Sequence, residues 1–505
     1  MPPVDIDPCS GREQYHRQYL QNLKSPNLFI KDAFIDGAWI SKTASFDVYE
    51  PATGTVLGQV ANCDVNDFRT AIASASAAQK EYYYNTTGTE RGELLRKWHD
   101  LIIQNQDDIA TLLCLENGKT FAEAKGEVVY AANFVSWFAE EATRSYGVTI
   151  PSSYKHTTLS TVREPVGVCG IITPWNFPAA MITRKVAPAL AAGCSVVIKP
   201  PSETPYTCLA LTKLAVDAGL PPKVIQACPT KDKKAATELA TNPLVRKISF
   251  TGSTKVGKML AELAAGTLKK VSLELGGNAP VIIFEDADLD LAVEGTMFSK
   301  FRCSGQTCVC ANRIYVHSSI RESFVKKLIA KTRELHIGPG MDSTTTQGPL
   351  VNKAAVNKVN EHIKDAVSKG ARIEYTSKPP GNSTGFYAPP TILSGVTSSM
   401  LVARDETFGP LAPIFEFKNE EEAIQLANDT EFGLAGYLFT RSIGKASRVA
   451  QRLQVGMVGV NTGKISAVEA PFGGVKESGY GREGSLYGLD EYQTIKSITV
   501  GNLDK

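Results

Sequence analysis

The sequence lacks a long hydrophobic run. No uninterrupted apolar stretch among its 505 residues approaches the ~18 residues that a membrane-spanning helix needs. The N-terminal region also lacks the charged and apolar parts of a secretory signal. Asp5, Asp7 and Glu13 count against a mitochondrial presequence, which is poor in acidic residues. We therefore expect a soluble cytoplasmic protein with no membrane partner.

An excess of charge of one sign is absent too. The 54 basic and 52 acidic residues give a formal net charge of +2. This balance gives no electrostatic reason to expect a nucleic acid or an anionic membrane as a partner. A small anionic ligand is compatible with it, because a few local arginines suffice to bind one.

Cysteines are few and scattered. Ten of them in 505 residues do not form a disulfide framework. Cys308 and Cys310 stand close together, but no companion cluster lies at the spacing of zinc ligands. We expect reduced thiols and no metal site.

The order of apolar segments predicts an α/β fold. Residues 66–146 have helical periodicity, and between residues 165 and 275 short apolar runs alternate with helical stretches. That alternation is typical of a parallel sheet with helices on its faces. A second set of the same kind begins at Pro280 and extends to about Gly474. We interpret the first set as a dinucleotide-sized domain and the second as a further α/β domain.

Three stretches lie outside these sets. Residues 1–33 form a polar leader, which packs on the surface or frays, and we assign no chemistry to it. Residues 34–40 predict a short strand pair with a turn at Asp36-Gly37. Residues 154–162 and 494–500 are predicted to be exposed edge strands, which need another strand to pair with. We interpret the last two as a subunit-contact element.

Two turns are candidates for binding a nucleotide. Residues 250–257 lead from a strand into a helix, where free N–H groups and the helix dipole favour a pyrophosphate. The stretch is not a GxGxxG motif, so on its own a structural turn is the better interpretation. Lys199-Pro-Pro-Ser202 lies at the carboxyl end of another predicted strand, where open parallel sheets bind ligands.

Three motifs carry the candidate chemistry. Cys308 follows Gly305-Gln306, Glu274 opens Glu-Leu-Gly-Gly, and Asn176 lies within Pro-Trp-Asn-Phe-Pro. Taken singly, Cys308 would be interpreted as a small buried apolar residue and Glu274 as a solvated carboxylate at a strand end. Asn176 would be interpreted as the cap of a helix. Together, in this order, they resemble the aldehyde dehydrogenase superfamily from about Phe34 to the C-terminus.

The resemblance implies an architecture. We expect a Rossmann-type cofactor domain at 1–144 and 163–275, with an α/β catalytic domain at 276–477. A small oligomerisation β-element would comprise 145–162 and 478–505, in a homodimer or homotetramer.

The resemblance also implies the roles of three catalytic residues. Cys308 attacks an aldehyde carbon, and the Asn176 amide and the Cys308 N–H stabilise the resulting oxyanion. Glu274 then activates the water that hydrolyses the thioester. The interval between Glu274 and Cys308 is that of the hydrolytic members, which argues against a phosphorylating or CoA-acylating enzyme.

The expected cofactor is NADP, with NAD as a second acceptable cofactor. Members that use NAD commonly place a glutamate three residues after the lysine that corresponds to Lys199, whereas this chain has Ser202. A serine tolerates a 2′-phosphate that a carboxylate repels, although Glu203 stands one place later. The residues that match the family's cofactor positions are Thr173, Pro174, Trp175, Lys199, Ser202, Gly252, Ser253, Gly257, Leu275, Glu406 and Phe408.

The expected substrate is a small semialdehyde that carries a carboxylate. Cys308-Val-Cys310, preceded by Lys300-Phe-Arg302, resembles the NADP-dependent succinate-semialdehyde dehydrogenases, which implies removal of the semialdehyde derived from γ-aminobutyrate. Arg184, Arg302 and Ser466 match the positions that hold the carboxylate. The alternatives are a solvent-facing helix residue for Arg184, glutarate semialdehyde as the substrate, and a non-catalytic protein on the same fold.

Cys308 and Cys310 also predict a redox switch. A reversible disulfide between them would stop activity, but cysteines two apart in an extended chain lie near the ~7 Å limit for bridging. The loop would therefore have to rearrange.

Overall fold

The first α/β set forms an eight-stranded sheet in the computed structural model, which describes residues 10–381 and 384–502. Its central strands run parallel, and the short strands at its two edges are antiparallel. In spatial order they are β19 (Gly479–Tyr480), β11 (Lys270–Glu274), β10 (Val245–Thr251), β7 (Val168–Ile172), β8 (Ser195–Lys199), β9 (Ile225–Ala227), β1 (Ala33–Ile35) and β2 (Ala38–Ile40). The parallel α/β architecture expected from the sequence is confirmed.

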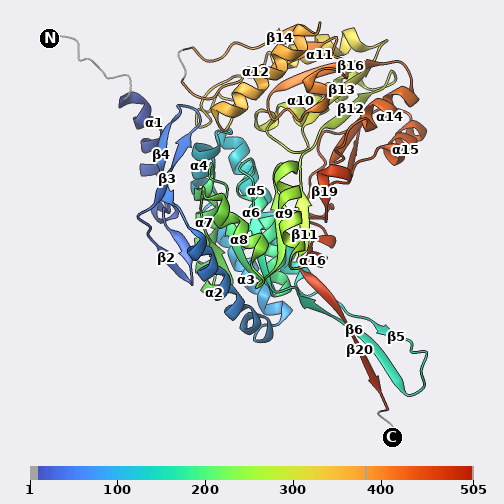
Figure 1. The fold of residues 1–505 in the computed structure, drawn as a ribbon. Helices are drawn as coiled ribbons and strands as arrows, with labels where there is room; N and C mark the ends of the chain where they lie inside the picture. The colour runs from blue at the N-terminus through green and yellow to red at the C-terminus, as the bar shows by residue number, and fades with distance from the viewer. Residues whose placement is uncertain (1–9, 382–383, 503–505) are drawn as a thin grey trace, which may run out of the picture.

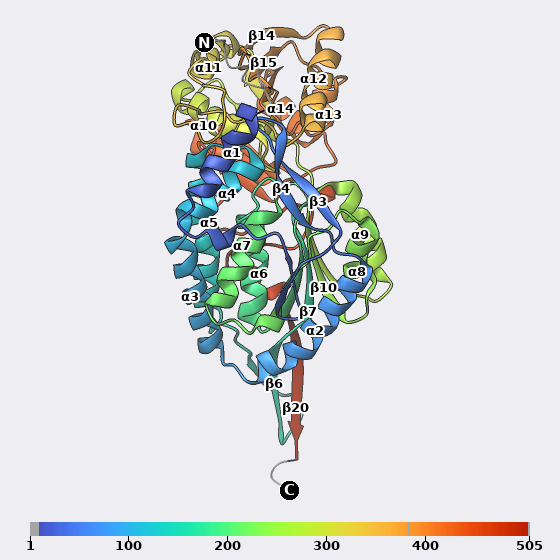
Figure 2. The ribbon, with the colours of Figure 1, turned by 90° about the vertical axis from the view of Figure 1, so that its left-hand side faces the viewer.

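Helices cover both faces of this sheet (Figures 1 and 2). One face carries α2 (Val65–Tyr84), α8 (Lys233–Thr241) and α9 (Thr254–Ala265). The other carries α3 (Gly88–Gln104), α4 (Gln106–Asn117), α5 (Phe121–Glu141), α6 (Ala180–Ala192) and α7 (Pro205–Asp217). Capping boxes at Asp64, Thr87 and Thr120 start α2, α3 and α5 by satisfying N–H groups of the first turn.

The second α/β set forms a seven-stranded sheet, which lies at the top in Figure 1. Its spatial order is β14 (Arg372–Thr376), β15 (Thr391–Ser394), β16 (Leu411–Phe417), β13 (Ala311–His317), β12 (Ala279–Ile283), β17 (Ala435–Phe439) and β18 (Met457–Val460). Only β14 is antiparallel within this described sheet. The accompanying helices are α10 (Leu289–Phe301), α11 (Arg321–Thr332), α12 (Lys353–Ser368), α13 (Leu401–Arg404), α14 (Glu420–Asn428) and α15 (Ile443–Arg452).

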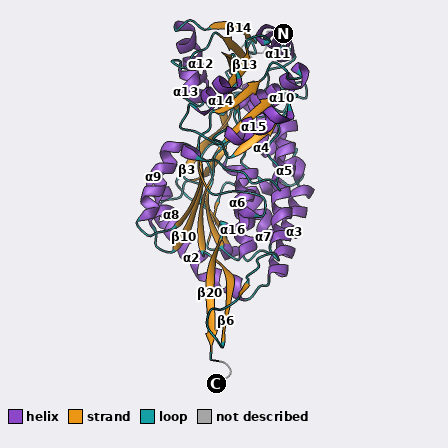
Figure 3. Ribbon diagram, turned by 90° about the vertical axis from the view of Figure 1, so that its right-hand side faces the viewer, coloured by secondary structure: helices purple, strands orange, loops and turns teal. Residues whose placement is uncertain are grey.

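A long arm projects from the body (Figure 3). It consists of β6 (Thr157–Pro165) paired antiparallel with β20 (Gln493–Gly501), and β5 (Thr149–Ile150) lies on the other side of β6. The two edge strands predicted from the sequence therefore pair with each other. Apolar side chains nevertheless stay exposed on the arm: Val148 is 58% exposed and Ile495 is 69% exposed.

The N-terminal elements pack against the first set. Helix α1 (Ser10–Gln21) contacts α4 and β4, so this part of the leader packs on the surface; residues 1–9 lie outside the described part. Strands β1 and β2 form the predicted hairpin, with Asp36 and Gly37 at φ of 54° and 81°. A second hairpin joins β3 (Ser45–Glu50) to β4 (Thr55–Ala61), and the short α16 (Tyr487–Asp490) precedes β20.

In the part of the chain that the structure describes, no helix is both long enough and apolar enough to cross a membrane. The exact domain boundaries given above remain a prediction.

Candidate active site

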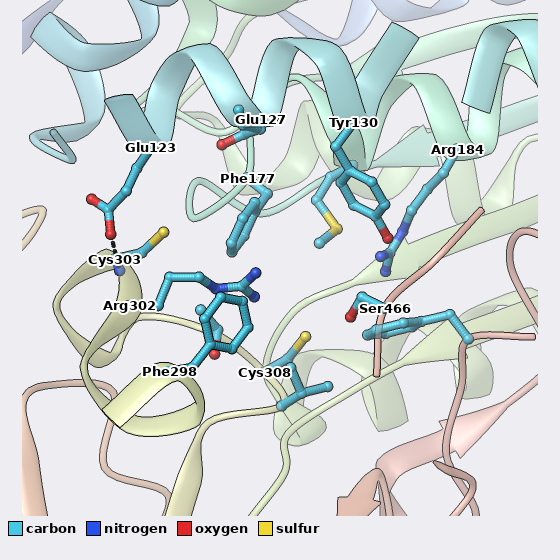
Figure 4. A pocket seen from close by; sticks show the side chains of 15 residues that line it. Glu123, Glu127, Tyr130, Phe177, Arg184, Phe298, Arg302, Cys303, Cys308 and Ser466 are labelled. Atoms are coloured by element: carbon cyan, nitrogen blue, oxygen red, sulfur yellow. Dashed lines mark hydrogen bonds between the residues drawn. The ribbon is translucent and has the colours of Figure 1, made fainter. Parts of the chain in front are cut away.

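Two cavities meet at Cys308, beside the carboxyl ends of β7, β10 and β11. The first, which we call the Arg302 cavity, has a volume of about 260 Å³, and Figure 4 shows it from close by. Its lining includes Tyr130, Arg184, Phe298, Arg302, Ser466 and Phe472. The second, which we call the α9 cavity, has a volume of about 210 Å³. Its lining includes Pro174, Trp175, Asn176, Gly252, Ser253, Leu275, Glu406 and Phe408. Cys308 lines both cavities, so its sulfur can meet one ligand from each side.

A strained turn places Cys308 at this junction. Between α10 and β13, Cys303, Ser304 and Gly305 have φ angles of 49°, 55° and 72°. A side chain at Gly305 would come within 2.2 Å of a backbone oxygen, so only glycine fits there. The Gln306 side chain fixes the loop, because its Oε1 accepts from the backbone N–H of Val351 at 2.9 Å. The segment that leads into Cys308 is therefore fixed.

The surroundings of Cys308 favour the neutral thiol. Burial, and next the charge of Glu274, hold the pKa of the Cys308 thiol well above its usual value, while Arg184 acts in the opposite direction. A thiol is a poor nucleophile until it loses its proton. Cys308 therefore has to lose its proton before it can attack, and the charge of the neighbouring Glu274 opposes that loss.

Glu274 belongs to a buried cluster of four charges. Arg184 donates a hydrogen bond to Glu274 and forms an ion pair with Glu483, which also pairs with Lys185. Thr251 Oγ1 donates to the same Glu274 oxygen at 3.0 Å. Glu274 is 3% exposed and Arg184 is 2% exposed. The alternatives of a solvated carboxylate and a solvent-facing arginine are therefore wrong.

Asn176 does not cap a helix. Its Nδ2 donates to the backbone carbonyl of Gln306 at 3.2 Å, which ties the loop before α6 to the loop of Cys308. Glu127 takes the capping position instead, because its Oε1 accepts from Ala179 and Ala180 at 2.8 and 3.4 Å. The helix-cap alternative for Asn176 is wrong.

A second buried ion pair holds the backbone of Asn176. Lys119 Nζ lies 2.5 Å from Glu127 Oε2, donates to the Asn176 carbonyl at 2.8 Å, and sits 4.0 Å from the centre of the Phe177 ring. The side chains of Lys119 and Glu127 are 0% and 1% exposed. Lys119 lies in a loop and Glu127 in a helix, and no sequence pattern predicted that they would pair.

Arg302 is the cation that faces the open space of its cavity. Its guanidinium lies 4.8 Å from the ring centre of Phe298 and 5.5 Å from that of Phe177, which the close-up shows on either side of it (Figure 4). Among residues 10–381 and 384–502, no ion pair involves Arg302. A cation held by aromatic faces without a counter-ion is suited to binding an anion. Ser466 lines the same cavity.

The α9 cavity fits a dinucleotide. It opens at the N-terminus of α9, where Ser253 is the N-cap residue but its side chain makes no capping hydrogen bond. A side chain at Gly257 would come within 2.3 Å of Leu275, so glycine lets α9 approach β11 closely. Free amides at a helix N-terminus bind phosphate, and close packing keeps them fixed.

Glu406 adds a titratable group to this cavity. It accepts from the backbone N–H of Gly277 at 3.0 Å, and burial raises the pKa of its carboxyl to about 7. Phe408 meets Trp175 edge to face, with 5.6 Å between ring centres. Lys358 also lines the cavity, and sequence reasoning missed it.

Several expected cofactor residues lie outside the lining of either cavity. Lys199 ends β8, and burial lowers the pKa of its ammonium while Glu203 raises it. Ser202 Oγ donates to the Glu203 carboxylate at 3.1 Å. The Thr173 N–H donates to the Lys199 carbonyl at 3.4 Å. These residues border one another at the carboxyl ends of β7 and β8.

Cys310 is buried away from the Arg302 cavity. Its Sγ donates to the Lys300 carbonyl at 3.3 Å, and the described cysteines are all free thiols. Cys303 lines the cavity instead, and burial raises its pKa to about 12. A Cys308–Cys310 disulfide remains a prediction. Among the described residues, no group of His, Cys, Asp or Glu is placed to hold a metal ion.

Aromatic lining residues were the other group that sequence reasoning missed. Tyr130 and Phe298 face the Arg302 cavity from α5 and α10. The buried Tyr130 hydroxyl has no hydrogen-bond partner among the described residues. A helical aromatic stripe is more often core than site, so periodicity alone does not single these residues out.

Replacing Lys119 by Met should destabilise the protein strongly. The change leaves the Glu127 carboxylate buried without its partner, which costs about 3–5 kcal/mol. Urea unfolding measures the loss. Lys125→Met on α5, the helix that carries Glu127, is the matched control, because it breaks the exposed Lys125–Asp107 pair and should cost under about 1 kcal/mol. Equal losses in the two variants would contradict the structural role of the buried pair.

The alkylation rate of Cys308 should rise with pH. Because its thiol pKa is raised, the reaction with iodoacetamide should accelerate about tenfold per pH unit from pH 7 to 9. The rate is obtained by mass spectrometry of the Cys308 peptide, after subtraction of the signal in Cys308→Ser. A plateau already reached below pH 8 would show that the thiol is ionised in the free protein.

Comparison with known proteins agrees with this site. The pattern of the aldehyde dehydrogenase family matches residues 39–498. A glutarate-semialdehyde dehydrogenase of Pseudomonas aeruginosa is 51% identical over 483 residues, which cover 95% of this chain and 100% of that protein. Succinate-semialdehyde dehydrogenase (NADP(+)) 1 of Schizosaccharomyces pombe is 50% identical over 490 residues, which cover 95% and 98% of the two chains.

A solved structure agrees as well. The crystal structure of succinate-semialdehyde dehydrogenase from Burkholderia pseudomallei superimposes with a TM-score of 0.93 at 52% identity, over 95% of this chain and 100% of that chain. The fold, the order of the motifs and these similarities lead to one conclusion. The chain belongs to the aldehyde dehydrogenase family.

Proposed function

We propose that this protein oxidises succinate semialdehyde to succinate with NADP⁺. One observation carries the proposal: Cys308 stands between a cavity with a cationic wall and a cavity at a helix N-terminus. A small aldehyde with a distal carboxylate fits the first, and a dinucleotide fits the second. The names of the relatives support the same substrate class.

The first chemical step belongs to Cys308. Its thiol proton passes to solvent, its sulfur bonds to the aldehyde carbon, and the negative charge moves to the former carbonyl oxygen. The Asn176 amide and the Cys308 N–H are the donors proposed for that oxygen, each with an effect of about 3–4 kcal/mol in comparable sites. The tie between Asn176 and Gln306 supports this role, because it fixes the amide beside the cysteine loop.

NADP⁺, when bound in the α9 cavity, would accept the hydride that turns the adduct into a thioester. We propose that Gly252, Ser253 and the first turn of α9 hold its phosphates, and that Glu406 holds the ribose next to the nicotinamide. Lys199 and Ser202 are proposed for the adenosine ribose. Trp175, Leu275 and Phe408, with Thr173 and Pro174, would complete the walls, and Gly257 keeps α9 close to β11.

The second step releases the acid. A water oxygen bonds to the acyl carbon, the carbon–sulfur bond breaks, and Glu274 takes a proton from the water. The buried position of Glu274 beside the sulfur supports its choice as this base.

Arg302 is the proposed main receptor for the substrate carboxylate. Its guanidinium has no ion-pair partner in the described part of the chain, and Ser466 adds a hydroxyl to the same wall. Glutarate semialdehyde is the second candidate substrate, because one methylene changes discrimination by only about 1–3 kcal/mol. The 51% identity to a protein named for that substrate supports glutarate semialdehyde as the second candidate.

We further propose a homodimer or homotetramer in which the arm makes a subunit contact. The exposed apolar side chains of the arm support this, because isolated sheets rarely leave such groups in water. The expected cytoplasmic location stays a prediction.

Replacing Arg302 by Ala should raise KM for succinate semialdehyde about 100-fold, since it removes a charged partner of the carboxylate. KM for propanal, which has no carboxylate, should change less than about threefold. Initial rates of NADPH formation measure both. Equal increases for the two aldehydes would contradict the proposed carboxylate receptor.

Replacing Ser202 by Glu should reverse the cofactor preference. A second carboxylate beside Glu203 would repel a 2′-phosphate, so kcat/KM for NADP⁺ should fall about 100-fold while that for NAD⁺ stays within about threefold. Ser202→Gln, which is similar in size but neutral, is the matched control. If both variants lose NADP⁺ activity equally, charge at this position does not select the cofactor.

A further inference from the structure

Arg184 serves two regions of the site at once. It lines the Arg302 cavity, where a substrate carboxylate would enter (Figure 4), and it also donates a hydrogen bond to Glu274. Its Nε lies against Glu483, so the guanidinium is held between two carboxylates. An arginine in this position connects the cavity with the base.

Glu274 itself lines neither cavity. Its Oε2 accepts from Arg184 and Thr251, while its Oε1 has no hydrogen-bond partner among the described residues. The carboxylate faces the Cys308 thiol. To take a proton from a water in the Arg302 cavity, which Glu274 does not line, it has to turn away from Arg184 towards that cavity. The hydrogen bond from Arg184 opposes that movement.

The buried charges balance before any substrate arrives. Arg184 and Lys185 face Glu274 and Glu483. An incoming carboxylate therefore meets Arg302, which forms no ion pair with the described residues, and Arg184, which lines the same cavity and donates to Glu274. Exchanging one carboxylate for another at Arg184 replaces one charge-assisted hydrogen bond by a similar one, so its net free-energy cost is small.

We propose that Arg184 is a latch on Glu274, and that the substrate's own carboxylate opens it. The carboxylate binds Arg302 and displaces Glu274 from Arg184, so that Glu274 becomes free to take a proton from the water that attacks the acyl group on Cys308. The acyl group on Cys308 keeps the distal carboxylate, so the latch stays open until the thioester is hydrolysed. Aldehydes without a carboxylate would acylate Cys308, and the resulting thioester would then be hydrolysed slowly. This inference rests on the proposed function and assigns Arg184 as a positioning residue.

Propanal and formate test the latch in the wild-type protein. Together they carry the carbon and oxygen atoms of succinate semialdehyde, with two C–H bonds in place of the carbon–carbon bond that joins the two parts. With propanal and NADP⁺ alone, stopped-flow absorbance should show a burst of NADPH followed by a slow phase. Sodium formate should accelerate the slow phase by roughly tenfold, the effect of one charge-assisted hydrogen bond, and leave the burst rate unchanged. Sodium chloride at equal ionic strength is the control and should do neither.

Three results would overturn the latch. They are the absence of a burst with propanal, a slow phase that formate does not accelerate, and equal acceleration of both phases. Turnover of succinate semialdehyde is measured first in the same preparation. If that turnover is absent, the proposed function fails; if it is present while formate has no effect, the latch alone fails.

Arg184→Met tests the assignment to this residue. Without the guanidinium, the slow phase with propanal should no longer respond to formate, and thermal unfolding checks that the variant is folded. If formate still increases the rate of the slow phase in the folded variant as it does in the wild type, the carboxylate acts through Arg302 alone. Arg184 is then not the latch. The wild-type measurement decides the proposal even if the variant does not fold.

Discussion

The site depends on the pairing of buried charges. Arg184, Lys185, Glu274 and Glu483 come from three separated parts of the chain, and the side chain of none of them is more than 10% exposed. A single ion of this kind left unpaired in the interior costs several kcal/mol, so the four are stable only as a set. The set joins α6, the end of β11 and the segment before α16. In this way folding brings the base, its arginine and the C-terminal region together.

The loop of Cys308 adds a steric constraint to this electrostatic one. Its left-handed turn fixes where the sulfur lies, and Asn176 reaches the same loop from the segment before α6. The buried Lys119–Glu127 pair holds that segment in turn. One sulfur atom is thus positioned by segments of both α/β sets, and two cavities of different character meet there.

Much of the fold could be predicted from the sequence, because it follows local patterns. Alternating apolar runs gave the parallel sheets, and the Asp36-Gly37 turn gave the first hairpin. The two strands of the arm were expected to be exposed, and they pair with each other. The cap of α6 could not be predicted, because the residue that caps it, Glu127, comes from another helix.

The candidate site could be predicted only in part. Motifs of the family gave Cys308, Glu274 and Asn176, but no pattern predicts that Arg184 binds Glu274, since 90 positions separate them. The charges at Lys119 and Glu127 and the aromatic rings of Tyr130 and Phe298 lie in helices or loops without a motif. Long-range contacts of single side chains are set by tertiary packing, which local periodicity does not encode.

The central claim is that Cys308 becomes acylated and that Glu274 removes the acyl group. The most direct measurement is intact-protein and peptide mass spectrometry of Glu274→Gln after reaction with succinate semialdehyde and NADP⁺. The account predicts one succinyl group on the Cys308 peptide, together with one NADPH released per chain. An unmodified Cys308, or an acyl group on another residue, would contradict it.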